Sequence, residues 1–160
     1  MKKIKIMFVC TGNICRSPLA HAVLDHKARE RGLTAAVETE SSGIHSYHVG
    51  DNADSRMRQT AKDKGVQLDH MARQLRLQDL SEYDVLLAMD RSHYREMERM
   101  AAGDLALLKK IKLFGAYLNG DDAKDIPDPY FGGQAGFDLV FDMVSEGCDN
   151  LLSDLEEQLT

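Results

Sequence analysis

The chain has 160 residues, of which 43% are hydrophobic and 29% charged, and its formal net charge at pH 7 is −6. This length and composition predict one domain, residues 1–160, with a single hydrophobic core. The negative charge argues against nucleic acid as a partner, and no apolar run approaches the length of a membrane span, so we expect no membrane insertion.

Strand-like and helix-like patterns alternate along the chain. The first expected strand covers residues 4–9, where apolar residues alternate and the pattern becomes apolar on both faces toward its end. The later elements are helices at 18–31, 53–65, 91–102 and 136–158, and strands at 37–42, 85–89 and 110–114. This alternation predicts an α/β fold with a parallel sheet and helices on both faces.

The segment Cys-Thr-Gly-Asn-Ile-Cys-Arg-Ser-Pro, residues 10–18, joins the first strand to the first helix. Ser17 suits a helix N-cap and Pro18 suits the first helical turn. The segment is therefore expected at the carboxyl end of a strand, where open α/β sheets bind ligands. Gly12 and Asn13 tolerate positive φ, which allows backbone N–H groups to converge on one point.

A thiol and a guanidinium stand at the two ends of this loop. Cys10 lies in a field of amides and a helix amino terminus, so its thiol is expected to ionise more easily than a free cysteine. The planar fork of Arg16 matches two oxygens of a phosphate group. The loop is thus predicted to hold a phosphate above a reactive thiolate, although a plain turn with buried cysteines also fits these residues alone.

A second segment, Ile-Pro-Asp-Pro-Tyr-Phe at residues 126–131, precedes the last helix. Its two prolines restrict the backbone on both sides of Asp128, so the carboxylate is presented on a stiff loop. Taken alone, Asp128 fits a solvated turn residue better than a catalytic one.

Together the two segments resemble the low-molecular-weight protein tyrosine phosphatase family, whose loop reads Cys-x-Gly-Asn-x-Cys-Arg-Ser-Pro and whose Asp-Pro-Tyr segment supplies a general acid. The resemblance covers nearly the whole chain and implies a single-domain, doubly wound, four-stranded parallel sheet. It implies hydrolysis of phosphotyrosine in tyrosine-phosphorylated proteins through a cysteinyl-phosphate, with inorganic phosphate as product. We expect no cofactor and no metal, because no Cys or His pair has the spacing of metal ligands.

The resemblance also assigns roles to individual residues. Cys10 would be the nucleophile, Asp128 the general acid and then base, and Arg16 the cation that stabilises the transferring group. The rest of the loop would bind the phosphate: Thr11, Gly12, Asn13, Ile14, Cys15 and Ser17. Aromatic side chains would wall the slot: Tyr47, Tyr130 and Phe131, the last being a departure because many members carry a second tyrosine there. Four residues would support the loops: His70, through a hydrogen bond to Asn13, with Asp54, Arg56 and Asp90.

Cys15 has two compatible interpretations. It packs under the loop, or it closes a disulfide with Cys10 that protects the nucleophile from over-oxidation, as the resemblance implies. A mechanism that needs free thiols predicts a reducing compartment, the cytoplasm.

Two other functions share parts of the pattern. Thioredoxin-coupled arsenate reductases have a similar Cys-x5-Arg loop but relay oxidation through downstream cysteines. Here the remaining cysteine is Cys148, on an apolar stripe of the last helix that predicts a core position. A catalytically silent phosphopeptide-binding module would be expected to lack Cys10 or Asp128. Both residues are present, so the sequence favours the phosphatase.

Overall fold

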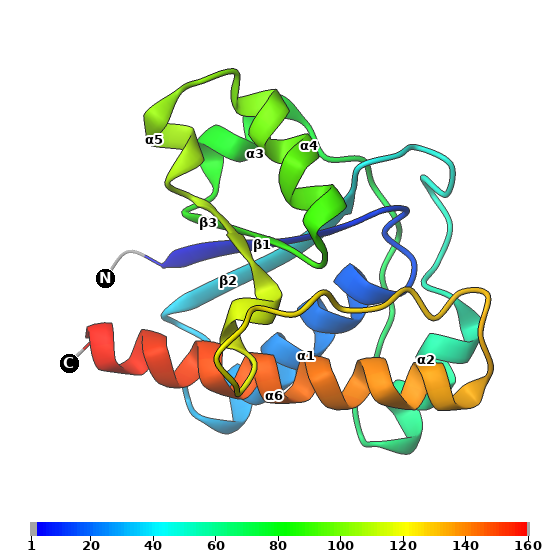
Figure 1. The fold of residues 1–160 in the computed structure, drawn as a ribbon. Helices are drawn as coiled ribbons and strands as arrows, with labels where there is room; N and C mark the ends of the chain where they lie inside the picture. Colours follow the sequence, from blue (N-terminus) through cyan, green and yellow to red (C-terminus); the bar gives the residue numbers. More distant parts are fainter. Residues whose placement is uncertain (1–2, 160) are drawn as a thin grey trace.

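A parallel sheet of four strands forms the centre of the computed structural model, which describes residues 3–159 (Figure 1). The strands are β1 (Ile4–Cys10), β2 (Val37–Gly43), β3 (Val85–Ala88) and β4 (Ile111–Leu113), in the spatial order β2-β1-β3-β4. All three pairings are parallel, and the β1–β2 register ends with Cys10 beside Gly43. The predicted fold class is confirmed.

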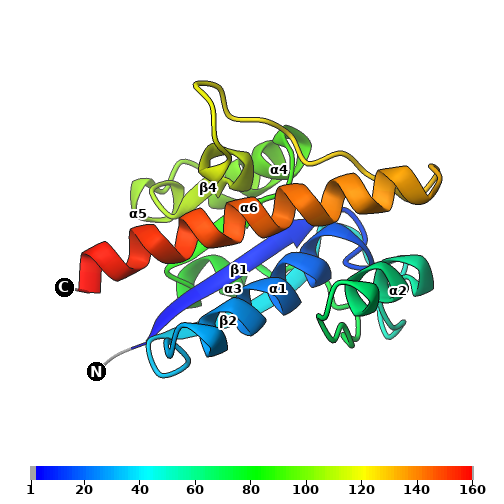
Figure 2. The ribbon, with the colours of Figure 1, turned by 90° about the horizontal axis from the view of Figure 1, so that it is seen from below.

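Helices cover both faces of the sheet (Figures 1 and 2). On one face α1 (Arg16–Glu30) packs against α6 (Gln134–Leu159), which also contacts α2 (Ser55–Asp63). On the other face lie α3 (Leu77–Glu82), α4 (Arg91–Ala101) and α5 (Leu105–Leu108), and a short 3-10 helix, η1 (Phe114–Tyr117), follows β4. Alternate residues of β1 therefore enter two cores: Ile6 and Phe8 on the α1 and α6 side, Met7 and Val9 on the α4 side.

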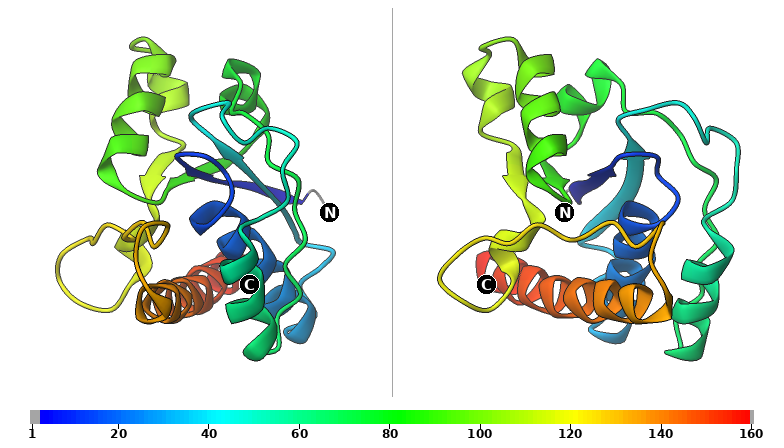
Figure 3. Two further views of the ribbon diagram at one scale, coloured as in Figure 1. Left: turned by 90° about the vertical axis from the view of Figure 1, so that its right-hand side faces the viewer. Right: turned by 45° about the vertical axis from the view of Figure 1, so that its right-hand side comes forward.

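The carboxyl end of β1 lies where the connections leave the sheet in opposite directions. The chain passes from β1 to β2 on one side, and β3 is the neighbour of β1 on the other. Figure 3 shows the loop after β1 (blue), the segment after β2 (cyan) and the segment before α6 (gold) gathered at this end of the molecule. Such a switch point is the usual ligand position in open α/β sheets.

The structure corrects the expected start of the first helix. The helix begins at Arg16, and its N-cap residue is Cys15, which makes no side-chain cap bond. The prediction of Ser17 as the N-cap is therefore wrong. The physical reason is that the hydroxyl of Ser17 is buried against Cys10 and Asn13.

The other predicted elements are present, with ends that differ from the expected ones by at most two residues. Helices α3 and α5 were not predicted, because helices of six and four residues have too few turns to show a period. None of the helices within residues 3–159 has both the length and the apolar composition that a bilayer crossing needs.

Candidate active site

The loop between β1 and α1 directs its carbonyl groups toward neighbouring segments. The carbonyls of Cys10 and Thr11 accept hydrogen bonds of 2.9 Å from the segment after β2, and that of Ile14 accepts one of 2.8 Å from Asp54 N. Within residues 3–159, the N–H groups of residues 12–15 donate to no protein acceptor. These amides lie at the amino end of α1, where the helix dipole adds partial positive charge. The loop is therefore suited to bind an anion.

Asn13 holds the loop in its shape. Its φ is 60°, a left-handed conformation that is unfavourable for most residues other than glycine. The buried side chain donates to Ser17 Oγ at 2.8 Å and to Ser41 Oγ at 3.1 Å. Its Oδ1 accepts a 3.0 Å bond from Arg73 N and lies 2.9 Å from His70 Nε2, the contact that the resemblance implied. These bonds offset the cost of the strained backbone.

The end of β2 supports the loop directly through Gly43. A Cβ atom at this position would lie 2.9 Å from the Thr11 oxygen, the Gly12 carbonyl carbon and the Asn13 nitrogen. Real Cβ atoms do not approach backbone atoms this closely, so only glycine allows the loop to rest against the strand.

Cys10 lies at the base of the loop and is 3% exposed. Its Sγ is 2.9 Å from Ser17 Oγ. Because Ser17 Oγ accepts from Asn13 Nδ2, its own hydrogen is available to Cys10 Sγ or, at 3.3 Å, to the Ser42 carbonyl. Asn13 and Ser17 are themselves fully buried. Their side chains thus support the loop from behind, and the phosphate-binding role expected for these two residues stays a prediction.

One edge of the Arg16 guanidinium is fixed and the other faces the loop. Nη1 donates to Asp90 Oδ2 at 2.7 Å and to the Ile126 carbonyl at 2.9 Å. Nη2 donates to Thr11 Oγ1 at 3.2 Å and lies 3.7 Å from Asp128 Oδ2. A buried, permanently charged group is thus held between the loop and the segment that carries Asp128.

His93, which was not predicted from the sequence, connects α4 to the loop. His93 Nε2 lies 2.8 Å from Thr11 Oγ1, and Nδ1 accepts a 3.2 Å bond from Asp90 N. Burial and the charge of Arg16 lower the pKa of His93 to about 4, so the ring is neutral at pH 7 and Nε2 donates to Thr11. The available signal was the spacing of Asp90 and His93 at a helix start, which matches a reciprocal capping pair.

Asp90 both caps α4 and anchors Arg16. Burial opposes ionisation of its carboxyl, but the hydrogen bond from Ser92 and the nearby His93 and Arg16 hold its pKa at about 2. The pKa of Asp90 is about 2 in the folded state and near 4 in the unfolded state. The ionised carboxylate therefore contributes its full stabilisation above about pH 4, and this stabilisation is lost as the pH falls toward 2.

We therefore expect Asp90→Asn, which keeps a capping oxygen, to lower the free energy of unfolding by about 2 kcal/mol at pH 6. At pH 3 the difference should shrink to about half of that value. Urea unfolding of both proteins at the two pH values measures it. A difference that stays constant with pH would contradict a role for the Asp90 charge.

Asp128 and its neighbours form one side of a pocket. Asp128 Oδ1 accepts a 3.0 Å bond from Tyr130 N, and the carboxylate is 46% exposed. The Tyr130 ring packs edge-on against Phe131 at 4.9 Å between centroids. Phe131 and, across the pocket, Tyr47 are 93% and 79% exposed. Large aromatic side chains so exposed beside a pocket are typical of a recognition surface.

Asp54 and Arg56 connect the loop to this aromatic wall. Asp54 caps α2, and its pKa is lowered because hydrogen bonds from Arg56 outweigh the effect of burial. The Arg56 guanidinium pairs with Asp54 at 3.0 Å and lies 5.3 Å from the centroid of the Tyr130 ring. The two residues thus position Tyr130, and we see no direct contact of either with Cys10.

The pocket has a volume of about 180 Å³. Its lining comprises Cys10, Thr11, Gly12, Ile14, Cys15, Arg16, Tyr47, His48, Asp128, Tyr130 and Phe131. His48 is the member that the sequence analysis did not identify. A larger hollow of about 460 Å³ lies between α2 and the segment at residues 65–69 and has no cysteine in its lining, so volume alone does not mark the site.

Cys15 and Cys148 differ from Cys10 in their surroundings. Burial, followed by the charges of Asp54 and Cys10, raises the pKa of Cys15, which therefore remains a thiol at pH 7. Cys148 is fully buried in α6, with Sγ 3.7 Å from the Ala20 carbonyl, so the predicted core position is confirmed. A thiol so enclosed cannot serve as a second relay cysteine.

Comparisons with known proteins agree with this geometry. The family model described as "Low molecular weight phosphotyrosine protein phosphatase" matches residues 5–160. A putative low molecular weight protein-tyrosine-phosphatase of Synechocystis is 40% identical over 98% of this chain and 99% of its own. The crystal structure of a protein tyrosine phosphatase from Entamoeba histolytica superimposes with a TM-score of 0.92 at 37% identity, over 99% of this chain and 100% of that one.

A Drosophila arginine phosphatase superimposes with a TM-score of 0.88 at 35% identity, covering 95% of this chain and 98% of its own. The family model and the curated relative each span almost the entire sequence, and the loop, the anchored arginine and the Asp128 segment lie together as the resemblance implied. The chain belongs to the low molecular weight phosphotyrosine protein phosphatase family.

Proposed function

We propose that the protein hydrolyses phosphotyrosine residues of proteins, with Cys10 as nucleophile. The observation that carries the proposal is that Cys10, Arg16 and Asp128 line one pocket of about 180 Å³. A nucleophile, a permanent cation and an acid around one cavity are the groups that transfer of a phosphoryl group to an enzyme requires.

In the first step the Cys10 thiolate attacks phosphorus in line with the bond to the leaving oxygen. An S–P bond forms and the P–O bond to the tyrosine oxygen breaks. The tyrosine leaves as a phenol because Asp128 donates a proton; a phenolate is a poor leaving group at neutral pH, since the pKa of tyrosine is about 10. The loop amides and Arg16 stabilise the charge on the equatorial oxygens.

In the second step water hydrolyses the cysteinyl-phosphate. The Asp128 carboxylate, which lost its proton in the first step, takes one from the attacking water. The P–O bond forms, the S–P bond breaks, and inorganic phosphate leaves with Cys10 again a thiolate. The same amides and Arg16 serve both steps, so neither step calls for a cofactor.

The aromatic wall supports a phosphotyrosine substrate. Cys10 is nearly enclosed, whereas Tyr47 and Phe131 stand exposed at the rim. A phosphorylated aromatic ring can reach the loop while it contacts these rings and Tyr130, whereas the shorter phosphoserine side chain cannot make both contacts. The protein is also expected in the cytoplasm, because the mechanism needs a reduced Cys10. A disulfide between Cys10 and Cys15 is proposed to protect the nucleophile from over-oxidation.

The test compares peptides of one sequence that carry phosphotyrosine or phosphoserine, hydrolysed by the wild-type protein with EDTA present. We expect kcat/KM to favour phosphotyrosine by at least about 100-fold, because the ring contacts are lost with serine. Because one structural neighbour is an arginine phosphatase, a phosphoarginine peptide belongs in the same series. A preference for phosphoserine or phosphoarginine would contradict the proposed substrate.

A further inference from the structure

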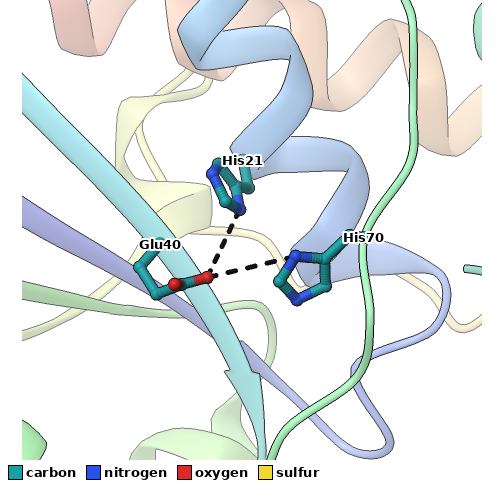
Figure 4. A group of neighbouring side chains, drawn as sticks. All are labelled: His21, Glu40 and His70. Carbon is teal, nitrogen blue, oxygen red and sulfur yellow. Dashed lines mark ion pairs between the residues drawn. The ribbon is translucent and has the colours of Figure 1, made fainter. Parts of the chain in front are cut away.

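Three side chains that bind metal ions well converge outside the pocket of Cys10. His21 comes from α1, Glu40 from β2 and His70 from the segment after α2, and Figure 4 shows them pointing toward one another. The Nδ1 atoms of His21 and His70 lie 3.7 and 4.0 Å from Glu40 Oε1, and the three ligand atoms lie within 4.8 Å of one another. Tetrahedral zinc with bonds of about 2.1 Å separates its ligand atoms by about 3.4 Å, so the three atoms would have to move closer to one another by at most about 1.4 Å.

The outer nitrogen of each imidazole has an acceptor. His21 Nε2 lies 3.3 Å from Asp25 Oδ2, and His70 Nε2 lies 2.9 Å from Asn13 Oδ1. A carboxylate oxygen and an amide oxygen can only accept, so both Nε2 atoms carry hydrogen. In each neutral ring the lone pair then belongs to Nδ1, the nitrogen that faces Glu40. Histidine ligands in metal sites are commonly oriented in this way by a partner on the other nitrogen.

The carboxylate of Glu40 is also held in place. Its Oε1 accepts a 2.8 Å bond from Ser41 N, and the Ser41 hydroxyl lies 3.4 Å from His21 Nδ1. A carboxylate oxygen and two imidazole nitrogens directed at one point attract positive charge, which a proton on a ring or a metal ion between the three atoms can supply. The geometry therefore favours occupation of this point by a positive ion.

Solvent reaches the three ligands. The side chains of His21, Glu40 and His70 are 19%, 32% and 13% exposed. A hollow of about 100 Å³ lies beside the two histidines and also has Asp25 and Asp69 in its lining. It gives an entry path and room for a water molecule as a fourth ligand.

We propose that His21, Glu40 and His70 bind one zinc ion, contrary to the expectation from sequence spacing, because the fold brings together residues that are distant in the chain. Two imidazoles and one carboxylate form a donor set that suits zinc among divalent ions. Because His70 also bonds to Asn13, the residue that holds the strained loop, the ion would fix the ring that supports the loop from behind. The site is therefore stabilising and takes no part in phosphoryl transfer.

The first experiment is a zinc titration of the freshly reduced wild-type protein by calorimetry, together with thermal unfolding. We expect one ion per chain and a rise in Tm of roughly 5–10 °C when free zinc is about 100 times its Kd. Cobalt serves as a second probe, because thiolate ligands give it a charge-transfer absorption that imidazole and carboxylate ligands do not. We expect that absorption to be absent.

The variants separate this site from the thiols of the pocket. His21→Ala should weaken zinc binding by at least about 100-fold and remove the rise in Tm. The matched control is His26→Ala, on the same helix, whose ring pairs with Glu30 at 3.5 Å and lies outside the cluster; it should bind zinc as the wild type does. Asp25→Asn, which alters only the partner of His21, should weaken binding by about tenfold.

If His21→Ala fails to fold, Glu40→Gln is the second variant, since it keeps the shape of the side chain and removes the charge. Zinc that leaves Tm unchanged, binding that survives both His21→Ala and Glu40→Gln, or a thiolate absorption with cobalt would each overturn the proposal. Hydrolysis measured with EDTA present is independent of these results, so failure of the zinc site would leave the proposed phosphatase activity untouched.

Discussion

Replacement of Cys10 by serine is expected to lower the turnover of p-nitrophenyl phosphate by at least about 10⁴-fold. A serine hydroxyl is not ionised near neutral pH, and the loop that would stabilise a thiolate cannot make it a comparable nucleophile. The variant should still bind inorganic phosphate, because the loop amides and Arg16 are unchanged. Steady-state kinetics measures the first effect and calorimetry the second.

Cys148→Ala is the matched control for the loss of a thiol, since Cys148 is enclosed in α6. It should keep turnover close to the wild-type value. Acid-quenched wild-type enzyme should carry one phosphoryl group on the peptide that contains Cys10. Substantial turnover by the serine variant, or a phosphoryl group on another residue, would rule out the covalent mechanism.

Asp128→Asn is expected to slow hydrolysis of phosphotyrosine by about 10² to 10⁴-fold, the usual contribution of a general acid. With p-nitrophenyl phosphate the rate of the first step should fall less, because the p-nitrophenolate leaving group is stable without a proton. The second step, hydrolysis of the cysteinyl-phosphate, still lacks a base in this variant. The variant should therefore release p-nitrophenol in a rapid burst of about one per enzyme and then turn over slowly, which stopped-flow absorbance detects.

Asp125→Asn provides the control in the same segment. Asp125 forms an exposed ion pair with Arg91 at 2.9 Å and lies outside the pocket lining. Exposed pairs contribute little, so its kinetics should stay near those of the wild type. Equal losses for Asp128→Asn on both substrates, with no burst, would show that another group protonates the leaving oxygen.

Local patterns were sufficient to predict the elements around the site. The alternation in β1 and the apolar stripe of α6 are long enough to show their periods, and the order of elements then requires a parallel sheet. The position of the loop at the end of β1 follows from that topology. Ser17 shows the limit of such rules: its residue type suits a cap, but the tertiary contact with Cys10 takes the hydroxyl instead.

Contacts between distant residues could not be predicted in this way. His93 and Thr11 are 82 positions apart, and Arg16 donates to a carbonyl 110 positions away, at Ile126. No period or spacing in the sequence connects these groups. The resemblance pointed to Asp90 and His70, but the links that join Arg16, Thr11 and His93 came only from the folded chain.

The close fit of Gly43 against the loop has a consequence for inhibitors. The loop forms the base of the pocket, and its shape is held by β2 and by the bonds to Asn13. An inhibitor therefore gains affinity there by matching a rigid cradle, with little conformational entropy lost by the protein. Selectivity among related enzymes has to come from the rim, where side chains such as Tyr47 and Phe131 can vary without disturbing that base.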